Sequence, residues 1–185
     1  SHAIGGFYKG ELIGNCKYSD ITVFSFHPVK IITTGEGGMA TTNDKKIYDL
    51  MNLYRSHGIS NSQKDMCPMP DDEIWRYQQI HLGYNYRMTD IQAALGLSQL
   101  KRLDQFIRRR HKIAERYNHA FEEIPIIIPK QCHNTRSSYH LYPIRIRRSL
   151  CNKTQRQLFN LMWSNGIGVN LHYIPVYLQP YYKKL

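Results

Sequence analysis

The sequence predicts an α/β protein in which short buried strands alternate with longer helices. Residues 21–24 form a β-branched and aromatic run that is typical of a buried strand. From residue 103 to residue 124, apolar side chains recur every three or four positions, as in a long amphipathic helix. Beyond residue 125, strand-like, helix-like and again strand-like stretches follow one another. That order indicates a second, smaller α/β unit.

The composition is that of a globular protein with a hydrophobic core. The chain has 185 residues, of which 42% are hydrophobic, so it can form one domain or one and a half. No apolar run approaches the roughly 20 residues that a membrane-spanning helix needs. Residues 1–6 lack the basic and apolar regions of a signal peptide. We therefore expect a cytoplasmic location and no membrane partner.

The cysteines are scattered along the chain and form no C-x-x-C pair. A disulfide framework or a zinc site would need closer or more regular spacing. We predict no metal site, and reduced, structural cysteines at Cys16, Cys67, Cys132 and Cys151.

The net charge of +11 makes nucleic acid the rival partner to consider. However, Arg108 and Arg109 fall on the polar face of the predicted long helix. Arg145 and Arg147 alternate with isoleucines, as on a half-solvated strand. Charge runs of this kind usually keep a surface soluble, so we expect no nucleic-acid partner.

Lys30 lies just past the end of the first predicted strand, which must stop where Pro28 removes a backbone donor. Ligand crevices of open α/β sheets lie at such strand ends, and the glycines of residues 35–38 would let backbone approach a bound group. Apolar neighbours such as Val29 and Ile31 would favour a neutral, nucleophilic amine by desolvating it. The alternative is a solvated loop lysine, the ordinary state of a lysine side chain.

The residues of this stretch carry a family resemblance. Residues 25–30, SFHPVK, followed after five residues by EGGM, resemble the DegT/DnrJ/EryC1/StrS family of pyridoxal-phosphate-dependent sugar aminotransferases. The resemblance implies part of a PLP-dependent transferase fold type I, the aspartate-aminotransferase-like fold. It implies that Lys30 holds pyridoxal 5'-phosphate as a Schiff base and that Ser25 binds its phosphate. The similar sugar 3-dehydratases have histidine in place of the lysine, so Lys30 favours amine transfer.

The first residues read like the middle of a structural element. In the family, a glutamate-aspartate-alanine triplet precedes a segment similar to residues 1–5, and its aspartate pairs with the cofactor's pyridine nitrogen. The resemblance places that aspartate before Ser1 and places His2 near the ring substituents of the cofactor. The alternative for His2 is a histidine at a frayed terminus. Because relatives also continue beyond residue 185, we expect a fragment that lacks both ends of the family fold.

Residues 37–82 predict a second strand, a helix and a long irregular segment. The strand covers residues 37–42, and the side-chain oxygen of Asn43 suits the start of a helix that runs through residue 54. Residues 56–82 contain turn formers and the acidic trio 71–73 but little periodicity. Loops of this length are usually functional or mobile. The resemblance implies that this one contributes to the active site and to the dimer contact.

Residues 83–90, GYNYRMTD, match a segment that recurs in the family. The resemblance implies that Asn85 reaches across a homodimer to the phosphate of the partner's cofactor. The alternative is an asparagine that satisfies loop backbone. Thr89 is placed to cap the next helix. In the long helix that follows, Arg110 interrupts the apolar stripe, and we expect its side chain to extend outward to solvent.

The last third of the chain predicts a strand, a helix and a substrate segment. Residues 139–147 alternate like a strand, and residues 152–154 open a helix that ends at Gly166. Residues 168–176 resemble the family's substrate-side segment, especially in enzymes that aminate nucleotide-linked 4-keto-6-deoxy sugars. The resemblance assigns sugar-nucleotide contacts to Asn170, His172 and Tyr173, in addition to Ser25 and Asn85. The alternative is an edge strand that turns at Pro175.

These elements predict three regions. Residues 1–100 form the C-terminal part of a large PLP-binding domain, residues 101–124 a long connecting helix, and residues 125–185 an incomplete small domain. The resemblance implies an enzyme that transfers an amino group from glutamate to a nucleotide-linked 4-keto-6-deoxy sugar, and the positive charge suits the substrate's diphosphate. The alternative function is a truncated, catalytically inactive remnant of such an enzyme.

Overall fold

The computed structural model of the protein describes residues 1–68 and 75–184, and the predicted acidic trio Asp71–Glu73 lies outside them. The chain groups into two compact units. The first contains Ser1–Lys112 and Gln131–His140, and the second contains Ile113–Lys130 and Leu141–Leu185. The predicted division at residues 100 and 124 into large domain, connecting helix and small domain stays a prediction.

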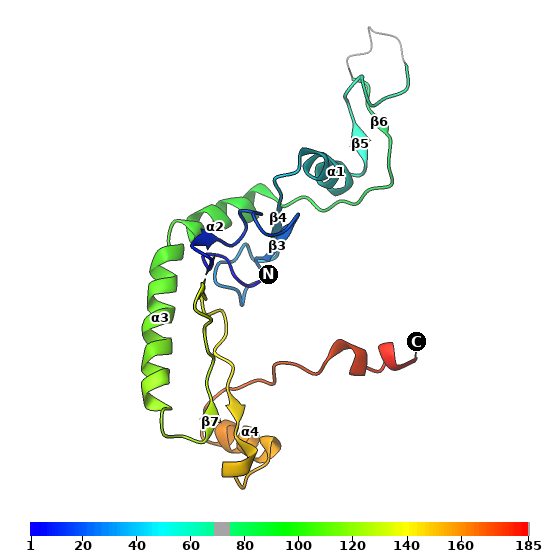
Figure 1. Ribbon diagram of the computed structural model, residues 1–185. Helices are drawn as coiled ribbons and strands as arrows, with labels where there is room; N and C mark the ends of the chain where they lie inside the picture. Colours follow the sequence, from blue (N-terminus) through cyan, green and yellow to red (C-terminus); the bar gives the residue numbers. More distant parts are fainter. Residues whose placement is uncertain (69–74, 185) are drawn as a thin grey trace. The chain divides into compact units, whose positions relative to one another are not determined.

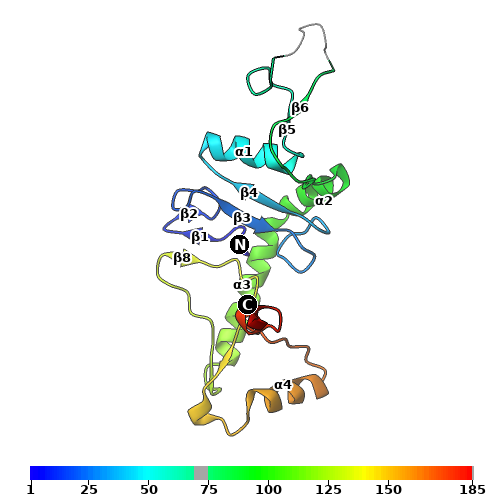
Figure 2. The same cartoon turned by 90° about the vertical axis from the view of Figure 1, so that its right-hand side faces the viewer.

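The described residues of the first unit contain three antiparallel sheets, two of them near the start of the chain. Strands β1 (Phe7–Tyr8) and β2 (Glu11–Leu12) form a hairpin, and β8 (Thr135–Arg136) pairs with the other side of β1. Strands β3 (Thr22–Ser25) and β4 (Gly38–Thr41) form a separate pair and lie side by side in Figure 2. The two strands predicted around Lys30 are therefore present, close to the predicted bounds.

The core of the first unit is built on β3 and the loop that follows it. Phe24, Phe26 and Ile32 are 6%, 5% and 3% exposed and contact one another. Side chains from the start of the chain, from the segment before α2 and from the long helix pack against this cluster: Ile4, Ile13, Met88, Leu103 and Phe106. Alternation in β3 explains the arrangement, because Phe24 points inward while Val23 is 58% exposed.

Helices α1 (Lys45–Arg55) and α2 (Asp90–Leu100) begin at side-chain caps. Asp44, rather than the predicted Asn43, caps α1 and accepts hydrogen bonds from the amides of Lys46 and Ile47. The Asn43 side chain instead donates to the backbone oxygen of Asn15. Thr89 caps α2 as predicted, with Gln92 completing a capping box.

The segment predicted to be irregular contains only one short strand pair among its described residues. Strands β5 (Ile59–Ser60) and β6 (Gln78–Gln79) pair antiparallel and extend beyond α1 in Figure 1. The segment begins at a close backbone contact. Gly58 has φ +69°, and a Cβ there would collide with the backbone oxygen of His81.

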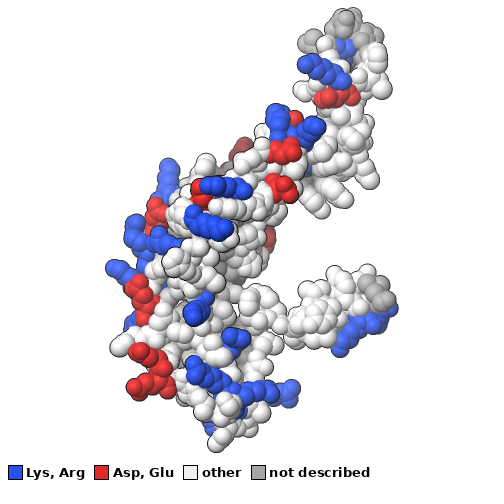
Figure 3. Space-filling model, in the orientation of Figure 1, with Lys and Arg blue, Asp and Glu red and all other residues white. Residues whose placement is uncertain are grey.

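Helix α3 (Leu103–Ala120) is the long amphipathic helix, with Ile107 and Ala114 buried. It stops four residues before the predicted end, and turns fill residues 121–124. Figure 3 shows basic and acidic side chains interspersed along its exposed side, where Arg108 and Arg109 lie.

The prediction that Arg110 extends to solvent is wrong. Its guanidinium is half-buried and donates to the backbone oxygens of Tyr139 and His140, at 2.9 and 3.3 Å. The side chain turns inward because these two residues lie outside any strand, and their carbonyl groups offer acceptors at the helix surface.

Besides the C-terminal end of α3, the described residues of the second unit contain one strand pair and one longer helix. Strands β7 (Ile126–Ile127) and β9 (Arg145–Ile146) pair antiparallel, and the 3-10 turn η1 (Arg148–Leu150) leads to α4 (Gln155–Ser164). Thr154, the last of the residues 152–154 predicted to open this helix, caps α4, and Gly166 follows with φ +74°. The 3-10 turns η2 (Val176–Leu178) and η3 (Tyr182–Lys184) complete the described chain.

Most of the strand predicted over residues 139–147 is absent. Only Arg145 and Ile146 join a ladder. Tyr139 has φ +49°, outside the extended region, and Arg110 takes its carbonyl oxygen. In the part of the chain that the structure describes, no helix is both long and apolar enough to cross a bilayer.

Candidate active site

The loop that carries Lys30 is closed by backbone hydrogen bonds at the end of β3. The amide of Phe26 donates to Gly37 O at 2.9 Å, and the amide of Thr34 donates to Phe26 O at 3.0 Å. Within this closure, the Lys30 amide donates to His27 O at 2.9 Å and forms a turn. Lys30 therefore has a fixed backbone position just after the strand, as the sequence predicts.

Burial differs sharply between Lys30 and its neighbours. Ile31 and Ile32 are 5% and 3% exposed, whereas Val29 is 63% exposed. Lys30 itself is half-buried. The two isoleucines anchor the loop in the core, and the lysine stands at the border between core and surface.

The Lys30 amine contacts the second residue of the chain. Its Nζ lies 2.8 Å from Nε2 of His2. The segment that carries His2 lies beside β3, because the backbone nitrogen of Ser1 donates to Val23 O. A protonated amine has only donors, so Lys30 donates to the Nε2 lone pair, and the ring proton of a neutral His2 is then on Nδ1.

Ser25 is the last residue of β3 and directly precedes the lysine loop. Its role as a phosphate contact stays a prediction. Its Oγ accepts a hydrogen bond from the His27 amide at 3.4 Å. A hydroxyl that accepts one hydrogen bond still has a hydrogen to donate, and phosphate oxygens are strong acceptors.

Two of the three glycines after Lys30 serve packing within the chain. A Cβ at Gly38 would lie 2.6 Å from Phe24 O across the β3–β4 ladder, and a Cβ at Gly37 would meet the side chain of Thr34. Gly35 differs from them, because a Cβ added there would meet no atom within 4 Å. Contacts within the chain therefore account for Gly37 and Gly38, and an approach to a bound group stays a prediction for Gly35.

Asn85 lies on another element, beyond the C-terminal end of α1. It forms an isolated antiparallel bridge with Ser56, and its Oδ1 accepts from Arg87 Nε at 3.3 Å. Arg87 also approaches the His57 ring, with one guanidinium nitrogen 3.5 Å from Nε2. Asn85 is exposed, so it is available to a group outside this chain.

Asn170, His172 and Tyr173 lie together in the second unit, on a segment with no regular structure. The rings of His172 and Tyr173 are 4.1 Å apart, and all three residues are exposed. Asn170 Oδ1 accepts a hydrogen bond from the amide of Leu171 at 2.8 Å. The edge strand considered as an alternative is absent here.

Sequence reasoning missed one residue of the lysine site. The ring of His140 packs against the ring of His2, with centroids 4.7 Å apart and planes at 71°. The sequence assigned His140 only to a strand. The available signal was Arg110, because an arginine inside an apolar stripe indicates an inward partner when a polar loop lies nearby.

Comparison with known proteins identifies the family. The family model of the DegT/DnrJ/EryC1/StrS aminotransferase family matches residues 1–185. The chain belongs to the DegT/DnrJ/EryC1/StrS aminotransferase family. The predicted resemblance is therefore confirmed along the whole chain.

One relative in this family is the UDP-4-amino-4,6-dideoxy-N-acetyl-beta-L-altrosamine transaminase of Campylobacter jejuni, 41% identical over 187 residues. The match covers 100% of this chain and 46% of the relative. The chain thus spans about half the length of the curated relatives it matches.

Two solved structures share the fold. PseC of Helicobacter pylori, an aminotransferase involved in the biosynthesis of pseudoaminic acid, superimposes with a TM-score of 0.86 at 32% identity, covering 100% of this chain and 47% of PseC. Spr1654 of Streptococcus pneumoniae, in its PLP-form, gives 0.83 at 33% identity, covering 99% and 45%. The predicted fold class, part of the α/β fold type I of PLP-dependent transferases, is confirmed.

The residues of the first unit fit pyridoxal phosphate chemically. A primary amine beside a proton acceptor suits an aldehyde, and a strand-end hydroxyl suits a phosphate. Within residues 1–68 and 75–184, no group of three or more histidine, cysteine or acidic side chains is placed to hold a metal ion. The cysteines at 16, 67, 132 and 151 are free thiols.

Proposed function

We propose that this chain supplies the cofactor lysine of a pyridoxal-phosphate-dependent sugar aminotransferase. The reaction moves an amino group from glutamate to a nucleotide-linked 4-keto-6-deoxy sugar. The observation that carries the proposal is the Lys30 amine, held 2.8 Å from the His2 imidazole at the end of β3. Family membership over residues 1–185 supports it.

Pyridoxal 5'-phosphate supplies an aldehyde for amine capture and a ring that withdraws electrons from the carbon that loses a proton. Lys30 would hold the cofactor covalently through its amine, and His2, whose Nε2 lies 2.8 Å from Nζ, would orient that amine. Once displaced from the cofactor, Lys30 would serve as the general base and acid that moves the substrate proton. Holding the cofactor and moving the proton both require that the Lys30 amine stays close to the reacting carbon during the whole reaction.

The phosphate contacts come from two subunits in this proposal. Ser25 donates to the phosphate in its own chain, and Asn85 serves the site of the second subunit of a homodimer. The exposed position of Asn85, fixed by Ser56 and Arg87 at the end of α1, supports a role toward another chain. The same two residues remain candidates for substrate contact.

The substrate contacts are proposed at Asn170, His172 and Tyr173. Their exposed amide, imidazole and phenol groups can bind sugar hydroxyls and diphosphate oxygens. A net charge of +11 favours an anionic nucleotide sugar. The cytoplasmic location stays a prediction.

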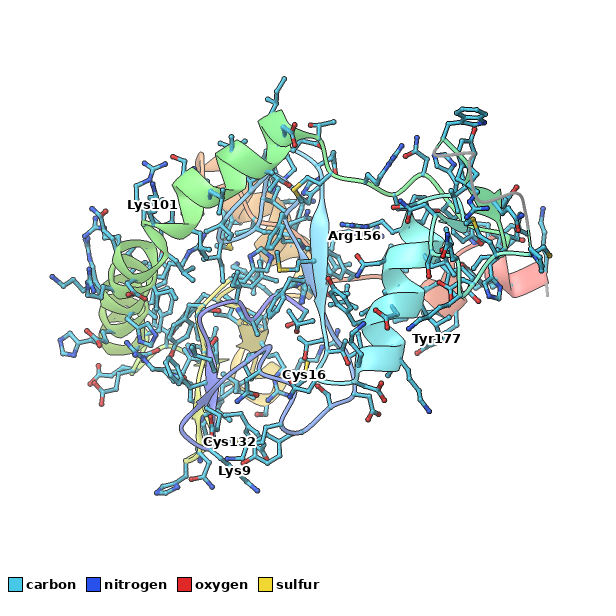
Figure 4. The ribbon with its side chains drawn as sticks, turned by 90° about the horizontal axis from the view of Figure 1, so that it is seen from above. Lys9, Cys16, Lys101, Cys132, Arg156 and Tyr177 are labelled. Carbon is cyan, nitrogen blue, oxygen red and sulfur yellow. The ribbon has the colours of Figure 1, made fainter. Side chains whose placement is uncertain are left out.

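The test of this proposal is Lys30→Ala in the full-length protein that contains this chain. The variant is expected to lose the visible absorbance of lysine-bound pyridoxal phosphate and to transfer amine at least about 1,000-fold more slowly. Borohydride reduction of the wild-type protein should leave the pyridoxyl label on the peptide that contains Lys30. The matched control is Lys101→Ala, at the turn between α2 and α3 in Figure 4.

Retention of that absorbance in Lys30→Ala would reject the assignment. The alternative of a truncated, inactive remnant makes a separate prediction, because it requires that the 185-residue chain transfers no amine. An assay of the purified chain with pyridoxal phosphate, glutamate and a 4-keto sugar nucleotide distinguishes the two functions, because measurable transfer would refute inactivity.

A further inference from the structure

Several side-chain hydrogen bonds hold the loop 137–140 against α3. Arg110 donates to two successive carbonyls of this loop, at Tyr139 and His140. Burial lowers the pKa of the Arg110 guanidinium, although the group remains charged at neutral pH. Desolvating a charge costs free energy, which two carbonyl partners offset.

Further contacts fix the rest of the loop. His111 Nε2 lies 2.8 Å from Ser137 O, and the Gln131 side chain accepts from the Ser137 amide at 2.6 Å and donates to the Tyr139 hydroxyl at 2.8 Å. Ser138 is 2% exposed. Tyr139 adopts φ +49°, a conformation that costs about 1 kcal/mol or more for a non-glycine residue. Such a backbone persists only where its surroundings determine it.

This fastening places the His140 ring against the lysine site. The ring meets His2 edge to face, with centroids 4.7 Å apart, and His2 in turn meets Lys30 Nζ at 2.8 Å. An edge-to-face contact fixes the plane of the imidazole, and the Nε2 lone pair lies in that plane. The direction of the lone pair toward Lys30 therefore depends on His140.

We infer that His140 is a positioning residue for the His2–Lys30 pair and that Arg110 holds His140 in place by binding the loop carbonyls. The inference deepens the proposed function, on which its catalytic meaning rests. The geometric part concerns His2 alone and holds without a cofactor.

The experiment compares His140→Leu with His140→Phe in the full-length protein. The first readout is the long-range proton–nitrogen NMR spectrum of the His2 ring in cofactor-free protein, which reports its tautomer and hydrogen bond. The second is the affinity for pyridoxal phosphate. The leucine variant should shift the His2 nitrogen signals and weaken binding about tenfold. The phenylalanine variant keeps an aromatic edge and should restore both.

Arg110→Gln tests the second step, with Arg109→Gln on the exposed side of α3 as the matched control. Arg110→Gln should shift the His2 signals although Arg110 does not bind His2, and Arg109→Gln should leave them unchanged. If His140→Leu or Arg110→Gln fails to fold by circular dichroism, the His2 signals of His140→Phe decide the test. Phenylalanine keeps an aromatic ring at position 140 and leaves the loop backbone unchanged.

Unchanged His2 signals in folded His140→Leu, or failure of His140→Phe to restore them, would overturn the inference. Failure of the proposed function gives a different result. In that case the wild-type protein shows no lysine-bound cofactor absorbance, while the His2 signals still respond to His140.

Discussion

The loop around Lys30 is proposed to bind the cofactor and the segment around His172 to bind the substrate, yet the chain orders these two regions to different degrees. The lysine loop is closed by Phe26–Gly37 and Thr34–Phe26 backbone bonds, and its isoleucines are buried. In the segment after Gly168, Tyr173 and Val176 are 63% and 62% exposed. The chain therefore orders the lysine loop with its own residues, whereas the proposed substrate segment is mostly exposed.

The largest difference expected between the two regions is in stability. Ile32→Ala should lower the free energy of unfolding by about 2–5 kcal/mol, because it opens a cavity beside Phe24 and Phe26. Ile174→Ala, at a residue that is 55% exposed, should change it by no more than about 0.5 kcal/mol. Urea unfolding of both variants measures the contrast. Equal losses would break the comparison and show that contacts from outside this chain order the substrate segment.

A smaller, equal effect is expected at the helix starts of the two units. Thr89→Ala and Thr154→Ala each remove a capping box and should cost about 1 kcal/mol. Thermal unfolding of each variant measures the loss, and serine at either position keeps the hydroxyl and serves as the control. A clear difference between the two alanine variants would mean that local helix signals, and not only burial, separate the regions.

The smallest effect concerns Cys16, beside the β3–β4 pair. Hydrogen bonding from the Thr41 hydroxyl lowers the pKa of this thiol. Because a lower pKa raises the thiolate fraction at a given pH, alkylation should reach half its maximal rate at lower pH in wild type than in Thr41→Val. Mass spectrometry of iodoacetamide-treated protein measures this shift in the pH of half-maximal alkylation. The pH is varied from 7 to 9, a range of about two units that includes the ordinary thiol pKa.

The matched control is Thr42→Val, whose hydroxyl bonds Asp20 O instead. An identical shift in both threonine variants would contradict the assignment to Thr41. Alkylation of Cys151, in the second unit, provides an internal reference for the amount of reagent consumed.

The sequence predicted the elements whose signals are local. Thr89 and Thr154 mark helix starts through their own side chains, and the strand before Lys30 is marked by its β-branched run and by Pro28. The motif at residues 25–39 also located the lysine correctly at the end of a strand. In each case the deciding interaction lies within a few residues of the signal.

The misses depended on contacts between distant residues. Arg110 meets Tyr139 and His140 across about 30 positions, so helical periodicity could place Arg110 in the apolar stripe but could not identify the carbonyl groups that it binds. The same contact converts a strand-like alternation at Tyr139 into a turned loop. Asp44, and not Asn43, caps α1, because the side-chain amide of Asn43 donates a hydrogen bond to the backbone oxygen of Asn15, far away in sequence.

The pairing of Lys30 with His2 has a practical consequence for dissecting this protein into pieces. A piece that lacked residues 1–3 would keep SFHPVK, EGGM and every described helix intact. A search for these sequence motifs would therefore still find it. It would nevertheless lose the imidazole that lies 2.8 Å from the Lys30 amine. Boundaries and protease sites should therefore be kept away from Ser1, His2 and Ala3.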